Sequence, residues 1–186
     1  MTSILTIFST PDMNTHQLFL IIEGLDDRQL FEAVIILRLT NHYDDIRIIE
    51  SSQKTKEFLR NLVRTCNHRQ VDYWKINDID GSPCITQKKE SLRGRNPDVP
   101  VDRILVVVKE IEGWYTAGLT NEACAALKAR FDRTPDEMTK EDFIRCIPNN
   151  YISTRAFMQD ILRHYSFDEA RIRSSSFHYC MSKLGL

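Results

Sequence analysis

Apolar and polar residues form alternating blocks along the first two-thirds of the chain. Four short apolar runs are bounded by polar residues, which is typical of strands covered on both faces of a parallel sheet. Between them, apolar residues such as Leu30, Phe31 and Val34 recur at helical spacing. Strands that alternate with helices predict an α/β fold with an open, mostly parallel four-stranded sheet flanked by helices. The predicted strands span residues 18–22, 46–49, 71–77 and 104–108.

The last third of the chain has a helical pattern throughout. Capping residues such as Asn121, Thr134 and Thr139 precede segments with helical spacing. No repeat, low-complexity tract or long linker divides the sequence. We therefore expect one domain over 1–186, with a core over 16–119 and a helical extension over 120–186 that caps the sheet. We expect residues 1–15 to form a short strand or arm.

Composition narrows the functional classes. Lys and Arg total 25 and Asp and Glu total 26, so a nucleic-acid-binding surface has to be local. The five cysteines are widely spaced without a C-x-x-C pair or a His-paired spacing, so the sequence indicates neither a disulfide framework nor a structural zinc site. They favour a reducing, cytoplasmic compartment. No apolar run is long enough to span a bilayer, and the N-terminus has no signal-peptide pattern.

Acidic residues follow three of the four predicted strands. Glu23 follows the first, Asp78 and Asp80 the third, and Glu110 and Glu112 the fourth. Asp78 and Asp80 are expected to point the same way, because residues two apart on an extended chain share a face. If the strands are neighbours, their carboxylates converge where parallel sheets bind ligands, and Mg²⁺ or Mn²⁺ would offset the repulsion. A polar turn in which Asp78 and Asp80 cap the next segment is the alternative.

Three motifs at these strand ends carry a family resemblance. Glu23-Gly24-Leu25-Asp26-Asp27 resembles the E-G-x-x-D first motif of TOPRIM domains, the topoisomerase–primase fold. Asp78-Ile79-Asp80 resembles their D-x-D motif, although Gly81 follows it earlier than in many members. Glu110-Ile111-Glu112-Gly113-Trp114 resembles the E-x-E-x-W element of stand-alone TOPRIM-like nucleases, which are related to phage-defence and OLD-type nucleases. The match spans roughly 18–119, and neither a topoisomerase tyrosine nor a primase zinc element is evident.

The resemblance implies a metal-dependent endonuclease that hydrolyses phosphodiester bonds in DNA or RNA with Mg²⁺ or Mn²⁺. Glu23 would be a metal ligand or general base, and Asp27, Asp78 and Asp80 would be metal ligands. Glu112, together with Glu110, would complete a second metal site. The resemblance also implies an ABC- or SMC-like ATPase partner in bacterial phage defence.

Several basic residues have two interpretations each. Lys109 either stabilises a developing phosphorane or forms a structural ion pair with Glu112. The basic residues after Asp80 either form a mobile arm that contacts phosphates or a solvated loop. Trp114 is expected to pack its helix onto the sheet rather than stack on a base. The basic residues are Lys88, Lys89, Arg93, Arg95 and Arg103.

Two rival functions remain open at the level of sequence. The chain could be a catalytically inactive TOPRIM-fold regulatory or scaffold subunit that binds a partner protein. It could also be an unrelated doubly wound domain, such as a phosphatase or a receiver domain with an acidic pocket. Carboxylate-dependent Mn²⁺ binding separates the nuclease from the inactive scaffold.

Overall fold

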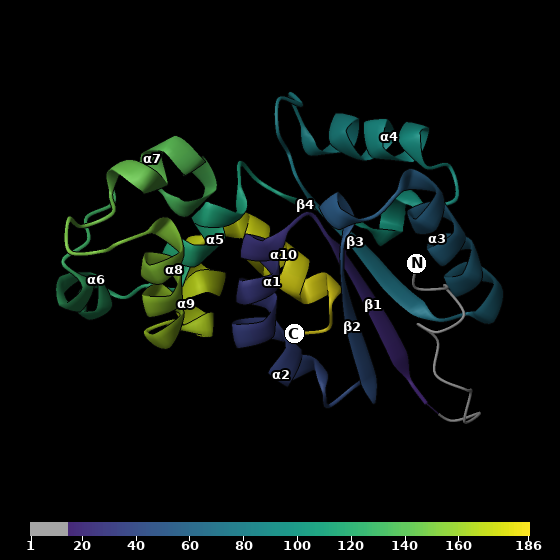
Figure 1. The fold of residues 1–186 in the computed structure, drawn as a ribbon, viewed down its shortest axis with the longest axis horizontal. Coiled ribbons are helices and arrows are strands. Elements are labelled where there is room, and N and C mark those ends of the chain that lie inside the picture. The colour runs from purple at the N-terminus through teal and green to yellow at the C-terminus, as the bar shows by residue number, and fades with distance from the viewer. Residues whose placement is uncertain (1–14) are drawn as a thin grey trace.

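The computed structural model describes residues 15–186, and it has an α/β architecture (Figure 1). Its four-stranded sheet has the order β2-β1-β3-β4, and every neighbouring pair is parallel. The predicted open parallel sheet is therefore confirmed. The arm expected over 1–15 lies almost entirely outside the described residues. The strands are β1 (Gln17–Ile22), β2 (Asp45–Glu50), β3 (Asp72–Asp78) and β4 (Ile104–Val107).

Helices cover both faces of the sheet. On one face, a core cluster joins alternate residues of β1, such as Leu18 and Leu20, to the helices α1, α2, α5 and α10. On the other face, Phe19 and Ile21 pack with α3 and α4. The alternation of side chains along a strand thus produces two apolar layers from one continuous apolar run. The covering helices are α1 (Leu25–Leu30), α2 (Ile36–Leu39), α3 (Lys56–Arg69), α4 (Ile85–Arg95), α5 (Ile111–Ala117) and α10 (Ser175–Lys183).

The connections differ in detail from the sequence prediction. A π-helical turn, Phe31–Ile35, joins α1 to α2 without a break in the helix. Ser51–Gln53 forms a 3₁₀ turn, so the N-cap of α3 is Thr55, whose hydroxyl accepts a hydrogen bond from the Phe58 amide at 3.1 Å. Two further 3₁₀ turns span Val101–Arg103 and Pro135–Glu137.

The helical extension packs mainly around α5. Figure 1 shows α6, α7, α8 and α9 grouped to one side of the sheet, while α10 returns to lie against β4. Most of these helices begin at a hydroxyl cap, as at Thr139 and Ser174, and Thr120 rather than Asn121 caps α6. The expected cap on the sheet is thus provided by α10, whereas the others extend from α5. Their bounds are α6 (Asn121–Leu127), α7 (Lys140–Arg145), α8 (Thr154–Arg163) and α9 (Phe167–Arg173).

Two residues of the E-x-E-x-W element, Gly113 and Trp114, pack α5 against its neighbours. A Cβ placed on Gly113 would lie 2.2 Å from the carbonyl oxygen of Pro135, so only glycine permits this approach. Trp114 is fully buried and donates from Nε1 to Ser176 Oγ at 2.7 Å. Its ring meets Phe177 edge-on at 5.2 Å between centroids. The expectation that Trp114 is a packing residue is confirmed.

A search of residues 15–186 for a membrane span gave none: each helix is too short or too polar to cross a bilayer. The cytoplasmic location and the single-domain organisation over 1–186 stay predictions.

Candidate active site

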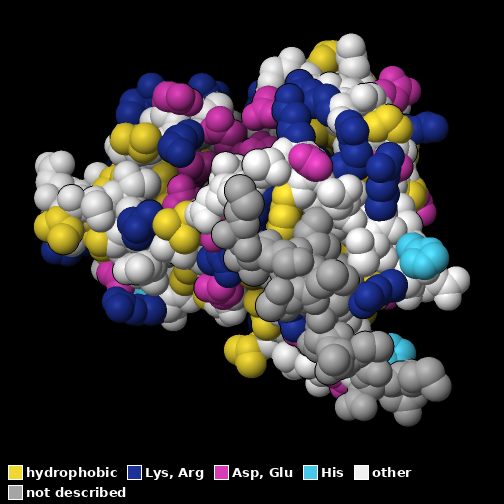
Figure 2. Space-filling model, turned by 45° about the vertical axis from the view of Figure 1, so that its right-hand side comes forward, with side chains coloured by type: hydrophobic (Ala, Val, Ile, Leu, Met, Phe, Trp, Pro, Cys, Tyr) yellow, Lys and Arg dark blue, Asp and Glu magenta, His cyan; other side chains and the backbone are white. Residues whose placement is uncertain are grey.

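A cavity of about 270 Å³ opens at the carboxyl ends of β1 and β3. The chain leaves β1 towards β2 on one side and leaves β3 towards β4 on the other, so strand order reverses between them. Ligands of open α/β sheets bind at such a switch point. Figure 2 shows acidic side chains gathered in a hollow with basic side chains on its rims. We call this hollow the acid cavity; its ionisable lining residues are Glu23, Asp26, Asp27, Asp78, Glu110, Glu112 and Lys140.

Glu23 stands directly after β1 and is oriented by its neighbours. Its backbone carbonyl accepts a hydrogen bond from the Ser52 amide at 3.1 Å. Its Oε1 accepts another from Nδ2 of Asn77, a buried residue of β3. The adjacent strand therefore fixes the Glu23 carboxylate at the cavity wall, a role of Asn77 that the sequence pattern did not reveal.

Asp27 lies in the first turn of α1 and is only 5% exposed. Its Oδ2 accepts a hydrogen bond from the Gly24 amide at 3.1 Å. Its Oδ1 is buried and has no hydrogen-bond partner among the described residues. Burial, reinforced by the nearby Glu23 carboxylate, raises the pKa of Asp27 to about 7.

Asp78 ends β3 and is the electrostatic centre of the group. Burial is the largest cause that raises its pKa to about 9, and repulsion from Asp27, Glu23 and Glu112 adds to it. Within the described chain its Oδ1 is also buried without a hydrogen-bond partner. Asp27 and Asp78 thus each present an unsatisfied carboxylate oxygen, which is costly unless a proton or cation offsets it.

Glu110 and Glu112 line the cavity at the start of α5, and both contact Lys140 of the helical extension. The backbone N–H of Lys140 donates to the Glu110 carboxylate. Lys140 Nζ lies 3.7 Å from Oε1 of Glu112, which is 3% exposed. Burial raises the pKa of Glu112 while Lys140 opposes that rise. Lys140 is far from the motifs in sequence, and only the packing of α7 against α5 brings it here.

Asp80 does not lie where its sequence position predicted. β3 ends at Asp78, and Asp80 takes a left-handed backbone conformation with φ of 48°. The alternation of an extended strand therefore stops before Asp80, and the expectation that Asp78 and Asp80 share a face is wrong. The Asp80 carboxylate instead pairs with Lys88 of α4, in a separate cavity of about 230 Å³ that Arg95 also lines.

Lys109 is exposed in a left-handed conformation with φ of 60° and does not line the acid cavity. Glu112 forms an ion pair with Lys140 instead, so the expected ion pair between Lys109 and Glu112 is wrong. The basic residues after Asp80 also separate. Lys88, Lys89, Arg93 and Arg95 lie on the regular helix α4, not on an irregular arm. Arg103 pairs at 2.9 Å with Asp72, at the amino end of β3 and away from the acids.

The donor chemistry of the acid cavity suits a hard divalent cation. All its candidate ligands are carboxylates, and those of Asp27 and Asp78 retain buried, unsatisfied oxygen atoms. In residues 15–186, no group of three or more His, Cys, Asp or Glu is arranged as a ready metal site. The carboxylates therefore share one cavity, and binding a cation would require side-chain adjustment.

No protein-family model, curated protein or solved structure matches the chain. An open parallel sheet with helices on both faces hosts many unrelated activities. Function has to be inferred from the acid cavity and the residues around it.

Proposed function

We propose that the chain is a Mg²⁺- or Mn²⁺-dependent nuclease of the TOPRIM-like kind that hydrolyses phosphodiester bonds in DNA or RNA. The observation that supports it most is the pair of carboxylates of Asp27 and Asp78, each with a buried, unsatisfied oxygen in a cavity shared with other acids. Converging carboxylates repel one another in a low-dielectric site, and a divalent cation would reverse that repulsion.

In this proposal, Asp27, Asp78 and Glu112 would hold the metal, and Glu23 would act as the general base. A bound divalent ion supplies Lewis-acid stabilisation of the phosphoryl oxygens and lowers the pKa of a water molecule. Glu23 accepts a hydrogen bond from Asn77 through Oε1, which leaves Oε2 to receive a proton from the attacking water. The Lys140 ammonium, at the cavity wall, would bind a phosphate oxygen of the substrate.

Motif order supports the same function. The first motif lies at the end of β1, Asp78 at the end of β3, and Glu110 and Glu112 at the start of α5, all around one cavity. We further propose, from the resemblance alone, that the nuclease is the effector of an ATPase-coupled phage-defence system with an ABC- or SMC-like partner. Nuclease assays therefore include an ABC- or SMC-like ATPase as the proposed partner.

Cutting of DNA and RNA with Mg²⁺ or Mn²⁺, with and without the ATPase, tests the proposal. Glu23→Gln and Asp78→Asn should each lower the cutting rate by about 100-fold or more, because each removes a proton acceptor or a metal ligand. Glu90→Gln is the matched control, since Glu90 is an exposed carboxylate outside the acid cavity. Equal cutting by the wild type and Asp78→Asn would exclude this assignment.

The ion pair between Lys140 and Glu112 favours a second candidate, a scaffold subunit without catalysis. In such a protein, the lysine would be the permanent counter-ion of the acids. Titration with Mn²⁺ by calorimetry separates the two. The nuclease should bind Mn²⁺ with an affinity that Asp78→Asn lowers at least tenfold, whereas a scaffold should show no binding that depends on Asp78.

A further inference from the structure

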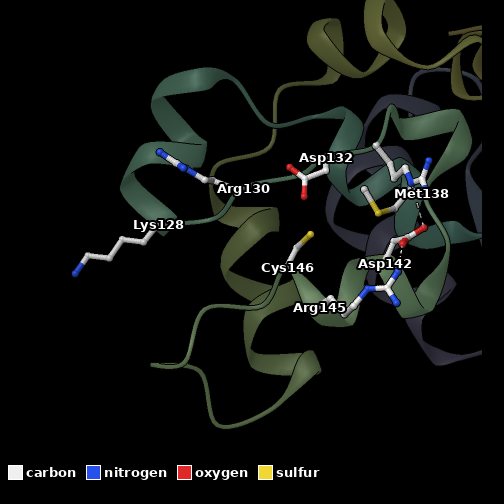
Figure 3. A pocket seen from close by; sticks show the side chains of 8 residues that line it. Lys128, Arg130, Asp132, Met138, Asp142, Arg145 and Cys146 are labelled. Carbon is white, nitrogen blue, oxygen red and sulfur yellow. Dashed lines mark hydrogen bonds and ion pairs between the residues drawn. The ribbon is translucent and has the colours of Figure 1, made fainter.

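A second cavity, of about 590 Å³, opens in the helical extension. Its walls come from the end of α6, the segment that follows it, and α7. Figure 3 shows Asp132 and Cys146 beside the hollow, Arg145 joined to Asp142, and Lys128 extending outward. We call it the arginine pocket, because Arg130, Arg133 and Arg145 line it together with Lys128.

Asp142 organises the cationic wall of this pocket. Its carboxylate pairs with the guanidinium of Arg145 and lies 3.8 Å from Nε of Arg133. The Thr139 hydroxyl donates to Asp142 Oδ2 at 2.9 Å. One aspartate therefore holds two guanidinium groups in place before a ligand arrives, which reduces the ordering cost of binding an anion.

The balance of charge in the arginine pocket is positive in a protein that is nearly neutral. Four cationic residues and two carboxylates, Asp132 and Asp142, line the pocket. Asp142 is already engaged by two arginines, which leaves Lys128 and Arg130 to contribute unneutralised charge. Asp132 is a hydrogen-bond acceptor and suits a ligand that carries amino groups beside its negative charge. A nucleotide has both features, and the cavity volume is in the range of small-ligand sites.

Helix α7 connects the arginine pocket to the acid cavity. Lys140, at the first residue of the helix, lines the acid cavity, and Arg145, at its last residue, lines the arginine pocket. Five residues of α-helix span about 7.5 Å. Phosphates of one stacked strand follow each other at about 3.4 Å along its axis, so about two or three nucleotides bridge this interval.

We propose that the arginine pocket binds one nucleotide of a single-stranded DNA or RNA substrate, a few nucleotides from the bond that is cut. Arg130, Arg133 and Arg145 contact its phosphate, and Asp132 accepts a hydrogen bond from the base edge. The assignment deepens the proposed function and rests on it, because it takes the ligand to be the same nucleic-acid strand.

Binding of a fluorescent single-stranded 12-mer in EDTA, followed by anisotropy, tests the pocket without catalysis. The double variant Arg130→Gln/Arg145→Gln should bind at least about tenfold more weakly. Its slope of log affinity against log salt should be shallower by about 1.4, the effect of two lost phosphate contacts on a single strand. Arg163→Gln is the matched control, because Arg163 also pairs with an aspartate three residues earlier and has similar exposure, yet lies outside the pocket.

The outcomes for the pocket and for the nuclease are separable. If the protein cuts with metal and the double variant binds with wild-type affinity, the pocket assignment is overturned and the nuclease proposal is supported. Weakened binding without cutting by any form would support the pocket and count against the nuclease. If circular dichroism finds the double variant unfolded, the single variant Arg130→Gln provides the test, since Arg130 is an exposed residue that lines the pocket. Unchanged binding and salt slope in folded Arg130→Gln would then overturn the assignment.

Discussion

Asp78 and Asp80 are two residues apart, yet they face different cavities: Asp78 lines the acid cavity, and Asp80 pairs with the buried ammonium of Lys88. The left-handed backbone at Asp80 causes this divergence. The two carboxylates of the D-x-D motif therefore have different surroundings, and their substitution should have different effects.

Asp80→Asn should destabilise the fold by about 1 to 2 kcal/mol, because it leaves the buried Lys88 side chain without its charge partner, while solvent screens the pair at the exposed Asp80 carboxylate. Asparagine tolerates the left-handed backbone, so strain contributes little. Urea unfolding measures the change. The double variant Asp80→Asn/Lys88→Met should recover most of the loss, and a double variant as unstable as Asp80→Asn would contradict the ion-pair explanation.

The metal-free protein should lose stability as the pH rises from about 4 to about 9. The folded-state pKa values of Asp27 and Asp78, about 7 and about 9, lie above the ordinary value of an unfolded aspartate. The folded state therefore binds more protons in this window, and its stability is greatest below the unfolded pKa and falls as the pH rises through the folded pKa.

Asp78→Asn removes the largest part of this pH dependence. In EDTA at pH 8, we expect Asp78→Asn to be more stable than the wild type by roughly 1 to 3 kcal/mol, the cost of one uncompensated buried group. Thermal melts from pH 5 to pH 9 measure the difference, with the exposed Glu90→Gln as control. A difference that shrinks as the pH rises would show that Asp78 does not have the raised pKa described above.

Lys140→Ala should raise the affinity of the acid cavity for Mn²⁺ by about two- to fivefold. The variant keeps the backbone N–H bound to Glu110 and removes only the cation 3.7 Å from Glu112. The effect is modest, because the Lys140 side chain is half exposed and solvent screens its charge. Calorimetry measures the affinity. Lys109→Asn, which changes an exposed lysine outside the cavity, should leave it unaltered.

Gly113→Ala should destabilise the protein by more than about 2 kcal/mol. The new Cβ would meet the Pro135 carbonyl oxygen at 2.2 Å, so the 3₁₀ turn must move away from α5. The displaced turn leads into α7, and the pair between Lys140 and Glu112 should be lost with it. Chemical denaturation and crystal structures check both effects.

Gly94→Ala is the natural comparison for this substitution. Gly94 lies in α4, and a Cβ there would have no atom within 4 Å. Alanine is the better helix former, so Gly94→Ala should stabilise the protein by about 0.5 to 1 kcal/mol. Similar destabilisation by both variants would indicate a general effect of alanine in these helices and not the contact between position 113 and Pro135.

The sheet was predictable because its signal is local. Buried parallel strands are continuous apolar runs, and the run at residues 104–107 could be identified without tertiary information. The convergence of Glu23 and Asp78 was also accessible, since strand ends meet at one edge whenever the strands are neighbours. The position of Asp80 was not, because a single left-handed residue changes the direction of its side chain and leaves no periodic pattern.

The position of Lys140 in the acid cavity could not be predicted from the sequence, for a different reason. Lys140 lies 28 residues after Glu112, and their meeting depends on the packing of α7 on α5 and on the close approach of the preceding 3₁₀ turn to Gly113. The sequence does contain the glycine and the Thr139 cap. Neither feature specifies which partner the helix contacts, because side-chain packing over such separations is not encoded in local periodicity.

The docking of α10 on β4 has a consequence for biosynthesis. The backbone N–H of Val108 and Nε1 of Trp114 both donate to Ser176 Oγ, and Phe177, Cys180 and Met181 are completely buried. A nascent chain that has emerged only as far as α9 carries every acid of the cavity but leaves the part of that face over β4 without α10. Such an intermediate exposes apolar surface, and it should bind chaperones or aggregate. The ribosome must therefore deliver residues 175–183 before this face of the sheet can close.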